Sequence, residues 1–174
     1  EKYYLEALNM QRRLFPEDDP GLATSIQNTA NFYADIGQFE KADTLYKEAL
    51  GMFRRIYKED NRDLAIILNN IGFFYQNLGK LEEAESLFIE SLEMRERMLK
   101  GDNPELAGSI QSMGVFYYNQ AKYEQAEPFY SRSLEMYKRL YKDDNERLAT
   151  ALANNASFYY SKGDYDKAEE LLIE

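Results

Sequence analysis

The side chains that most often carry out catalysis and bind metals are missing from this 174-residue chain. It contains no cysteine and no histidine, which removes thiol nucleophiles, the commonest general base and the usual ligands of zinc. The acidic run from Asp143 to Glu146 lacks the alternating ligands and the glycine of a calcium loop. No spacing of the remaining carboxylates, lysines and hydroxyls pairs a nucleophile with a base. We therefore expect a protein that is not an enzyme and has no metal site and no cofactor.

The chemistry that remains is recognition by amide side chains. Asparagine and glutamine offer both a hydrogen-bond donor and an acceptor, which suits them to pair with the backbone of an extended peptide. Many of these amides recur at fixed places in an internal repeat. The repeat is marked by a Leu-Ala pair every 42 residues, at Leu22-Ala23, Leu64-Ala65, Leu106-Ala107 and Leu148-Ala149.

The repeat keeps its residue types in register when positions are counted from the alanine of each pair as position one. Position eight is always glycine or alanine, position ten is phenylalanine, position eleven is tyrosine and position twenty is alanine. Phenylalanine and tyrosine stand together at Phe32-Tyr33, Phe74-Tyr75, Phe116-Tyr117 and Phe158-Tyr159. Because these pairs recur beside the apolar stripe of every repeat, we expect them in the core and between repeats.

Each repeat is predicted to be a pair of helices. In the second repeat, one helical face carries apolar or small residues at Leu68, Ile71, Gly72 and Tyr75, Gly79 breaks the helix, and a second apolar stripe starts at Leu81. The first helix of each repeat is expected to begin at a capping side chain, namely Asp19, Asn61, Asn103 and Asn145. The fold class predicted from the spacing is all-α.

These columns, the sets of equivalent positions in the four repeats, resemble the pattern of the tetratricopeptide repeat. The resemblance covers the whole chain and rests on the small residue at position eight, the tyrosine at eleven, glycine at fifteen in three repeats, alanine at twenty and usually an aromatic at twenty-four. Ala121 at position fifteen and Leu172 at position twenty-four depart from the pattern. The 42-residue length is similar to that of the kinesin-light-chain-like subclass. The resemblance implies a right-handed α-solenoid of antiparallel helix pairs, with first helices on the concave face and protein–protein interaction as the function.

The chain is expected to form one array over residues 1–174. Residues 1–21 read as the second helix of an incomplete repeat, residues 22–63, 64–105 and 106–147 as full repeats, and residues 148–174 as a truncated fourth repeat. Neither end has the atypical, polar-faced repeat that seals such arrays. We therefore expect the chain to be part of a longer parent.

The first helices are predicted to line an uncharged, amide-rich concave groove. Positions one to thirteen of the four repeats contain one charged residue, Asp35, although 30% of the chain is charged. The side chains predicted to contact a peptide there are Asn28, Asn31, Asn69, Asn70, Phe73, Gln76, Asn77, Gln111, Tyr118, Asn119, Asn154 and Tyr160. Phe73 and Tyr118 are the expected anchors. The asparagines at position six could equally bridge neighbouring helices.

Charge restricts the class of partner. The net charge of −10 repels nucleic acid and anionic lipid, and no apolar run approaches the ~18 residues of a membrane span, so we expect neither kind of partner and a cytoplasmic location. The tetratricopeptide domains that clamp carboxylates use lysine or arginine from their first helices, and the groove columns contain neither. The expected ligand is a protein or peptide segment that is not strongly acidic.

Two functions remain open from the sequence. The first is a scaffold or adaptor that binds a segment of another protein. The second is a peptide-sensing repeat module of a bacterial regulator or signalling NTPase, in which a small peptide closes the superhelix and alters an attached output domain. An attached nucleotide-binding or DNA-binding domain in the parent chain would favour the sensor.

Overall fold

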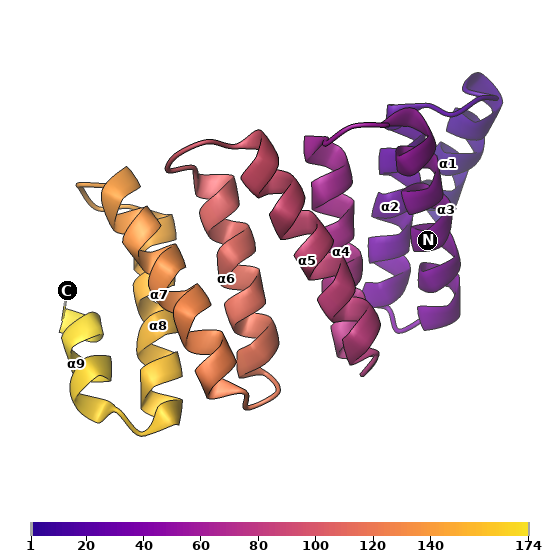
Figure 1. Cartoon of the computed structure of the whole chain (residues 1–174). Helices are drawn as coiled ribbons and strands as arrows, with labels where there is room; N and C mark the ends of the chain where they lie inside the picture. Colours follow the sequence, from indigo (N-terminus) through magenta and orange to yellow (C-terminus); the bar gives the residue numbers. More distant parts are fainter. Residues whose placement is uncertain (1, 174) are drawn as a thin grey trace.

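The structure is a row of helix pairs packed side by side. The computed structural model describes residues 2–173, and these residues form nine α-helices and no strand (Figure 1). The helices are α1 (Lys2–Leu14), α2 (Pro20–Asp35), α3 (Phe39–Ile56), α4 (Arg62–Asn77), α5 (Leu81–Met98), α6 (Pro104–Tyr118), α7 (Tyr123–Leu140), α8 (Glu146–Lys162) and α9 (Tyr165–Ile173). Helices α2 and α3, α4 and α5, α6 and α7, and α8 and α9 form antiparallel pairs. The all-α prediction is confirmed.

The first helix of each pair starts at a side-chain cap. The Asp19 carboxylate accepts a hydrogen bond from the Leu22 N–H at 2.9 Å, and the Asn61 side chain accepts one from the Asp63 N–H at 2.8 Å. Asn103 and Asn145 cap α6 and α8 in the same way. These acceptors satisfy backbone donors that the helix leaves unpaired. The four predicted caps are confirmed.

The turn inside each pair requires a left-handed residue. Gly37, Gly79 and Gly163 take this conformation at φ of 75°, 74° and 87°, where glycine has no Cβ to clash. Ala121 occupies the same place at φ 56° and is the one non-glycine residue of the described chain with positive φ. The third repeat therefore carries local backbone strain at its turn.

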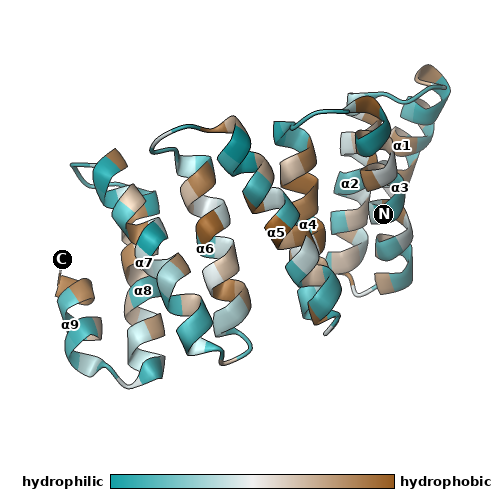
Figure 2. Ribbon diagram, viewed as in Figure 1, coloured by the Kyte–Doolittle hydropathy of each residue, from teal (hydrophilic) through white to brown (hydrophobic). Residues whose placement is uncertain are grey.

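Position eight is small because the two helices of a pair meet there. A Cβ built on Gly72 would lie 2.9 Å from the Phe88 ring, and one on Gly114 would lie 3.2 Å from the Tyr130 ring. The phenylalanines at position ten and the tyrosines at position eleven are buried or nearly so, as predicted; Phe32 is half-buried. Figure 2 shows that the connections between helix pairs are hydrophilic, whereas hydrophobic residues are concentrated on the helices themselves.

Neighbouring pairs are joined through the tyrosines of position eleven. The Tyr75 hydroxyl donates to the Asp43 carboxylate at 2.8 Å, and the Tyr117 hydroxyl donates to Glu85 at 2.6 Å. Burial, together with the hydrogen bond to Glu85, raises the pKa of Tyr117 to about 12. Each bond links a first helix to the second helix of the preceding pair, so it fixes the register between repeats.

A second set of links lies on the outer surface. Each of three arginines grips an aspartate of the preceding connection through its Nε and Nη2 atoms: Arg55 with Asp18, Arg97 with Asp60, and Arg139 with Asp102. The arginine hydrogen bonds hold the pKa of these aspartates below the ordinary value. No helix among residues 2–173 is long and apolar enough to cross a membrane.

Candidate peptide-binding surface

The first helices α2 and α4 enclose a hollow that gathers four of the predicted contact residues. Asn31, Asn70, Phe73 and Asn77 line it together with Asp35, and its volume is about 390 Å³. Phe73 is half-buried, with its ring edge-on to Phe88 at a centroid distance of 4.9 Å. A ring held in this way presents a fixed apolar surface to a ligand.

Asn31 is tied into its own helix pair. The Tyr46 hydroxyl donates to the side-chain Oδ1 of Asn31 at 2.5 Å, and burial raises the pKa of Tyr46 to about 12. The side chain of Asn31 is therefore positioned by the core beneath it. Part of its hydrogen-bonding capacity serves structure rather than a ligand.

A second hollow, of about 320 Å³, lies between α4 and α6. Asn69 lines it, as predicted, beside Ile66, Gly108 and Ser112. Three charged residues, Arg62, Arg95 and Glu105, also line it, and all three lie outside the thirteen positions that sequence analysis considered. The absence of ions along the groove columns thus does not extend to the space between the helices.

A third hollow joins the turn ends of the second and third pairs. Gln76, Asn77 and Asn119 line it with Leu81, Gln120 and Lys122, and its volume is about 650 Å³. The side-chain Oε1 of Gln76 is buried without a hydrogen-bond partner among the described residues. A buried acceptor of this kind is usually satisfied by water or by a ligand.

The remaining predicted residues lie apart from these hollows. Tyr118 spans the seam to the next repeat: its hydroxyl forms a hydrogen bond with Ser161 at 2.8 Å, and its ring packs edge-on to Tyr130 and Phe158. Asn28 is exposed, Gln111 and Asn154 are half-buried, and Tyr160 is 66% exposed against Tyr165. Helices α2, α4 and α6 therefore carry the candidate surface.

Arg95 is the residue that sequence analysis missed. It stands at position 31 of its repeat, where the first and third full repeats have the aromatic residues Phe53 and Tyr137. An arginine at a repeat position that is otherwise occupied by aromatic residues was the signal in the sequence that Arg95 has a role of its own. Arg95 is 8% exposed, and burial lowers the pKa of its guanidinium.

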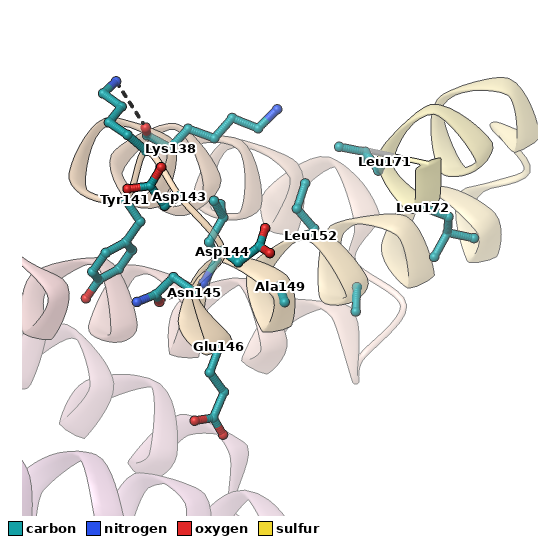
Figure 3. A pocket seen from close by; sticks show the side chains of 13 residues that line it. Lys138, Tyr141, Asp143, Asp144, Asn145, Glu146, Ala149, Leu152, Leu171 and Leu172 are labelled. Carbon is teal, nitrogen blue, oxygen red and sulfur yellow. Dashed lines mark hydrogen bonds between the residues drawn. The ribbon is translucent and has the colours of Figure 1, made fainter.

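Another hollow lies at the end of the row, with a volume of about 890 Å³. Apolar residues of α8 and α9, among them Ala149, Leu152 and Leu171, line it together with charged residues of the connection from α7 to α8 (Figure 3). Ala149 is exposed there, whereas Ala65 and Ala107 at the same position are fully buried. In those repeats, serines from the second half of the second helix, Ser91 and Ser133, hydrogen-bond the carbonyls of the two alanines. The hollow is the space that this half-helix fills in the other pairs.

A row of antiparallel helix pairs, linked pair to pair and carrying its polar hollows along the first helices, defines an α-helical repeat protein of the solenoid class. Models of the tetratricopeptide repeat match residues 22–63 and 64–105, and another matches residues 106–174. The chain belongs to the tetratricopeptide repeat family. The resemblance inferred from the columns is confirmed.

Solved structures share the fold along nearly the whole chain. BtubC (BKLC) from P. vanneervenii is 26% identical with a TM-score of 0.83, over 98% of this chain and 68% of that one. A Podosopora anserina protein with nearly identical TPR-like repeats, assigned as a kinesin light chain, is 16% identical with a TM-score of 0.81, over 99% and 82%. These neighbours are kinesin-light-chain-like arrays, as the repeat length indicated.

A Rap protein complexed with competence and sporulation factor has the same fold, with a TM-score of 0.79 at 20% identity, over 98% of this chain and 45% of that one. No curated protein sequence matches the chain. The chain thus belongs to a family whose arrays in general bind proteins or peptides and are typically non-catalytic.

Proposed function

We propose that this chain is a non-catalytic scaffold or adaptor module that holds a segment of a partner protein against α2, α4 and α6. The observation that carries the proposal is the arrangement of three hollows along these helices, each lined by at least one amide side chain together with apolar and charged residues. Amides suit the backbone of an extended segment, because they both donate and accept hydrogen bonds.

The dimensions suit a short segment. Three neighbouring helices at about 9 Å spacing cover about 18 Å, which corresponds to about five or six residues of extended chain. An apolar side chain of the segment would pack on Phe73, and its backbone would meet Asn70 and Asn77. Because the net charge of −10 repels acidic chains, we propose a partner segment that is largely uncharged.

The proposal is tested by selecting binders from a random peptide library and measuring their affinity for variants by calorimetry. Phe73→Ala should weaken the selected peptides by about 30-fold, because truncating an apolar anchor costs about 2 kcal/mol, and Asn70→Ala should weaken them less. Ile89→Ala is the matched control, since Ile89 is an exposed apolar residue of α5 that lines none of the three hollows.

Circular dichroism must show that each variant keeps its helices. Peptides that bind Phe73→Ala and Asn70→Ala as tightly as the parent chain would refute the site. Small-angle scattering then separates the scaffold from the peptide sensor: an adaptor keeps its dimensions when the peptide binds, and a sensor closes.

A further inference from the structure

Arg95 is a buried cation whose hydrogen-bond partners are all neutral. It extends from α5 into the seam between α4 and α6, and its Nη1 donates to Ser91 Oγ at 2.7 Å, to Ser109 Oγ at 2.6 Å and to the Ala65 carbonyl at 3.4 Å. Within residues 2–173 no carboxylate forms an ion pair with it. Charged side chains are rarely buried without a counter-charge, because desolvation of the ion is costly.

Glu105, the carboxylate that lines this hollow, is already paired with Arg62. Glu105 lies near enough for its charge to act on Arg95, but its two oxygens accept hydrogen bonds from Arg62 Nε at 2.8 and 3.0 Å. The Arg62–Glu105 pair neutralises itself at the rim of the hollow. A net positive charge therefore remains at Arg95.

The unoccupied edge of the guanidinium is the one suited to a carboxylate. Nε is buried without a partner, and Nη2 makes no hydrogen bond with any residue of the described chain. Arg55, Arg97 and Arg139 use this same Nε and Nη2 edge to hold an aspartate each. The two parallel N–H groups match the spacing of carboxylate oxygens.

The hollow beside Arg95 has room for such a group. Its volume of about 320 Å³ is roughly that of ten water molecules at about 30 Å³ each, enough for a carboxylate and the short stem that carries it. Ile66 and Gly108 form apolar wall, and Asn69 adds an amide donor. The hollow opens on the same row of first helices as the candidate surface.

We propose that the hollow between α4 and α6 is a carboxylate site, in which a carboxylate of the partner segment binds the guanidinium of Arg95. Because Nε is buried, the carboxylate binds at Nη2. This inference rests on the proposed function and refines it: the bound segment is largely neutral and places one carboxylate, from a side chain or from a C-terminus, at this point.

The site can be tested without the partner by NMR on the whole chain. The Arg95 Nε–H resonance is followed while three small probes are added in separate titrations. N-acetylglycine has a terminal carboxylate, and the α-methylamide of N-acetylaspartate has a side-chain carboxylate. N-acetylglycine methylamide has no carboxylate. We expect a saturable shift of this resonance with at least one carboxylate and none with the neutral amide. The two carboxylates distinguish the sources. No shift at Arg95 with either one would overturn the proposal.

A pair of charge-matched variants shows whether Arg95 itself is responsible. Arg95→Gln should abolish the saturable response of the neighbouring Asn69 side-chain resonance. Arg97→Gln loses the same charge from the outer surface and should keep that response. A response that survives in Arg95→Gln overturns the proposal, and if that variant does not fold, the titration of the parent chain decides alone.

Selected peptides separate this inference from the proposed function. Replacing the carboxylate of a bound peptide by an amide should weaken binding to the parent chain by about tenfold or more, and should leave binding to Arg95→Gln unchanged. If neutral peptides bind with an affinity that depends on Phe73 and not on Arg95, the carboxylate site is refuted and the proposed function is not. If the library contains no binder, the proposed function is refuted, and the titrations with the small probes still test the carboxylate site.

Discussion

Replacing Ala121 by glycine should stabilise the chain, because this alanine occupies a left-handed turn that glycine fills in the other three repeats. Its φ of 56° costs an L-residue about 1–2 kcal/mol. Glycine relieves that cost, but it loses about 0.4–1 kcal/mol through the greater freedom of the unfolded chain. The expected net gain in the free energy of unfolding is about 0.5–1 kcal/mol, which for a chain of this size raises Tm by about 1–4 °C.

The assay is urea denaturation followed by circular dichroism, with a thermal scan alongside. Gly79→Ala is the reciprocal control: Gly79 has φ 74° and a Cβ there would meet nothing within 4 Å, so only backbone strain is added. It should lose about as much stability as Ala121→Gly gains. If both substitutions were neutral, or if Ala121→Gly destabilised the chain, the account of the turn would be refuted.

Three further predictions concern packing and the links between repeats. Gly72→Ala should destabilise the chain by about 1–3 kcal/mol in urea denaturation, because the new Cβ would lie 2.9 Å from the Phe88 ring. Gly108→Ala is the control and should be tolerated, because its Cβ would meet only the Tyr137 hydroxyl, at 3.5 Å. Tyr117→Phe should cost about 1 kcal/mol by removing the hydrogen bond to Glu85, and hydrogen exchange should show the loss at the α5–α6 seam. Asp18, Asp60 and Asp102 have a folded pKa below the unfolded value, so the stability that they supply is present above pH ~4 and is lost as pH falls through the folded pKa. Asp102→Asn should therefore flatten the decline of stability below about pH 4, while an equally strong decline in the variant would contradict this assignment.

The repeat architecture could be predicted because each of its determinants is local and recurs. A cap such as Asn61, a small residue such as Gly72 and a tyrosine such as Tyr75 each perform one steric or hydrogen-bonding task, and the same task returns every 42 residues. Register then follows from spacing alone. The core assignments were confirmed for the same reason.

The candidate site was less accessible to sequence analysis, because it depends on side chains that arrive from other helices. Arg95 comes from a second helix and reaches the row of first helices through the seam, which no count along the first helix can reveal. Tyr118 was placed on the groove by its angle, yet its hydroxyl is within reach of Ser161 of the next repeat and its ring enters the seam. Helical angle alone does not distinguish a groove from a seam between repeats.

Chemical-shift mapping of a selected peptide on the isotopically labelled chain shows directly whether a partner segment lies along α2, α4 and α6. We expect the shifts to concentrate at Asn70, Phe73 and Asn77 and at the hollow beside Arg95. Shifts confined to the outward faces of α3, α5 and α7, with these residues unaffected, would contradict this expectation.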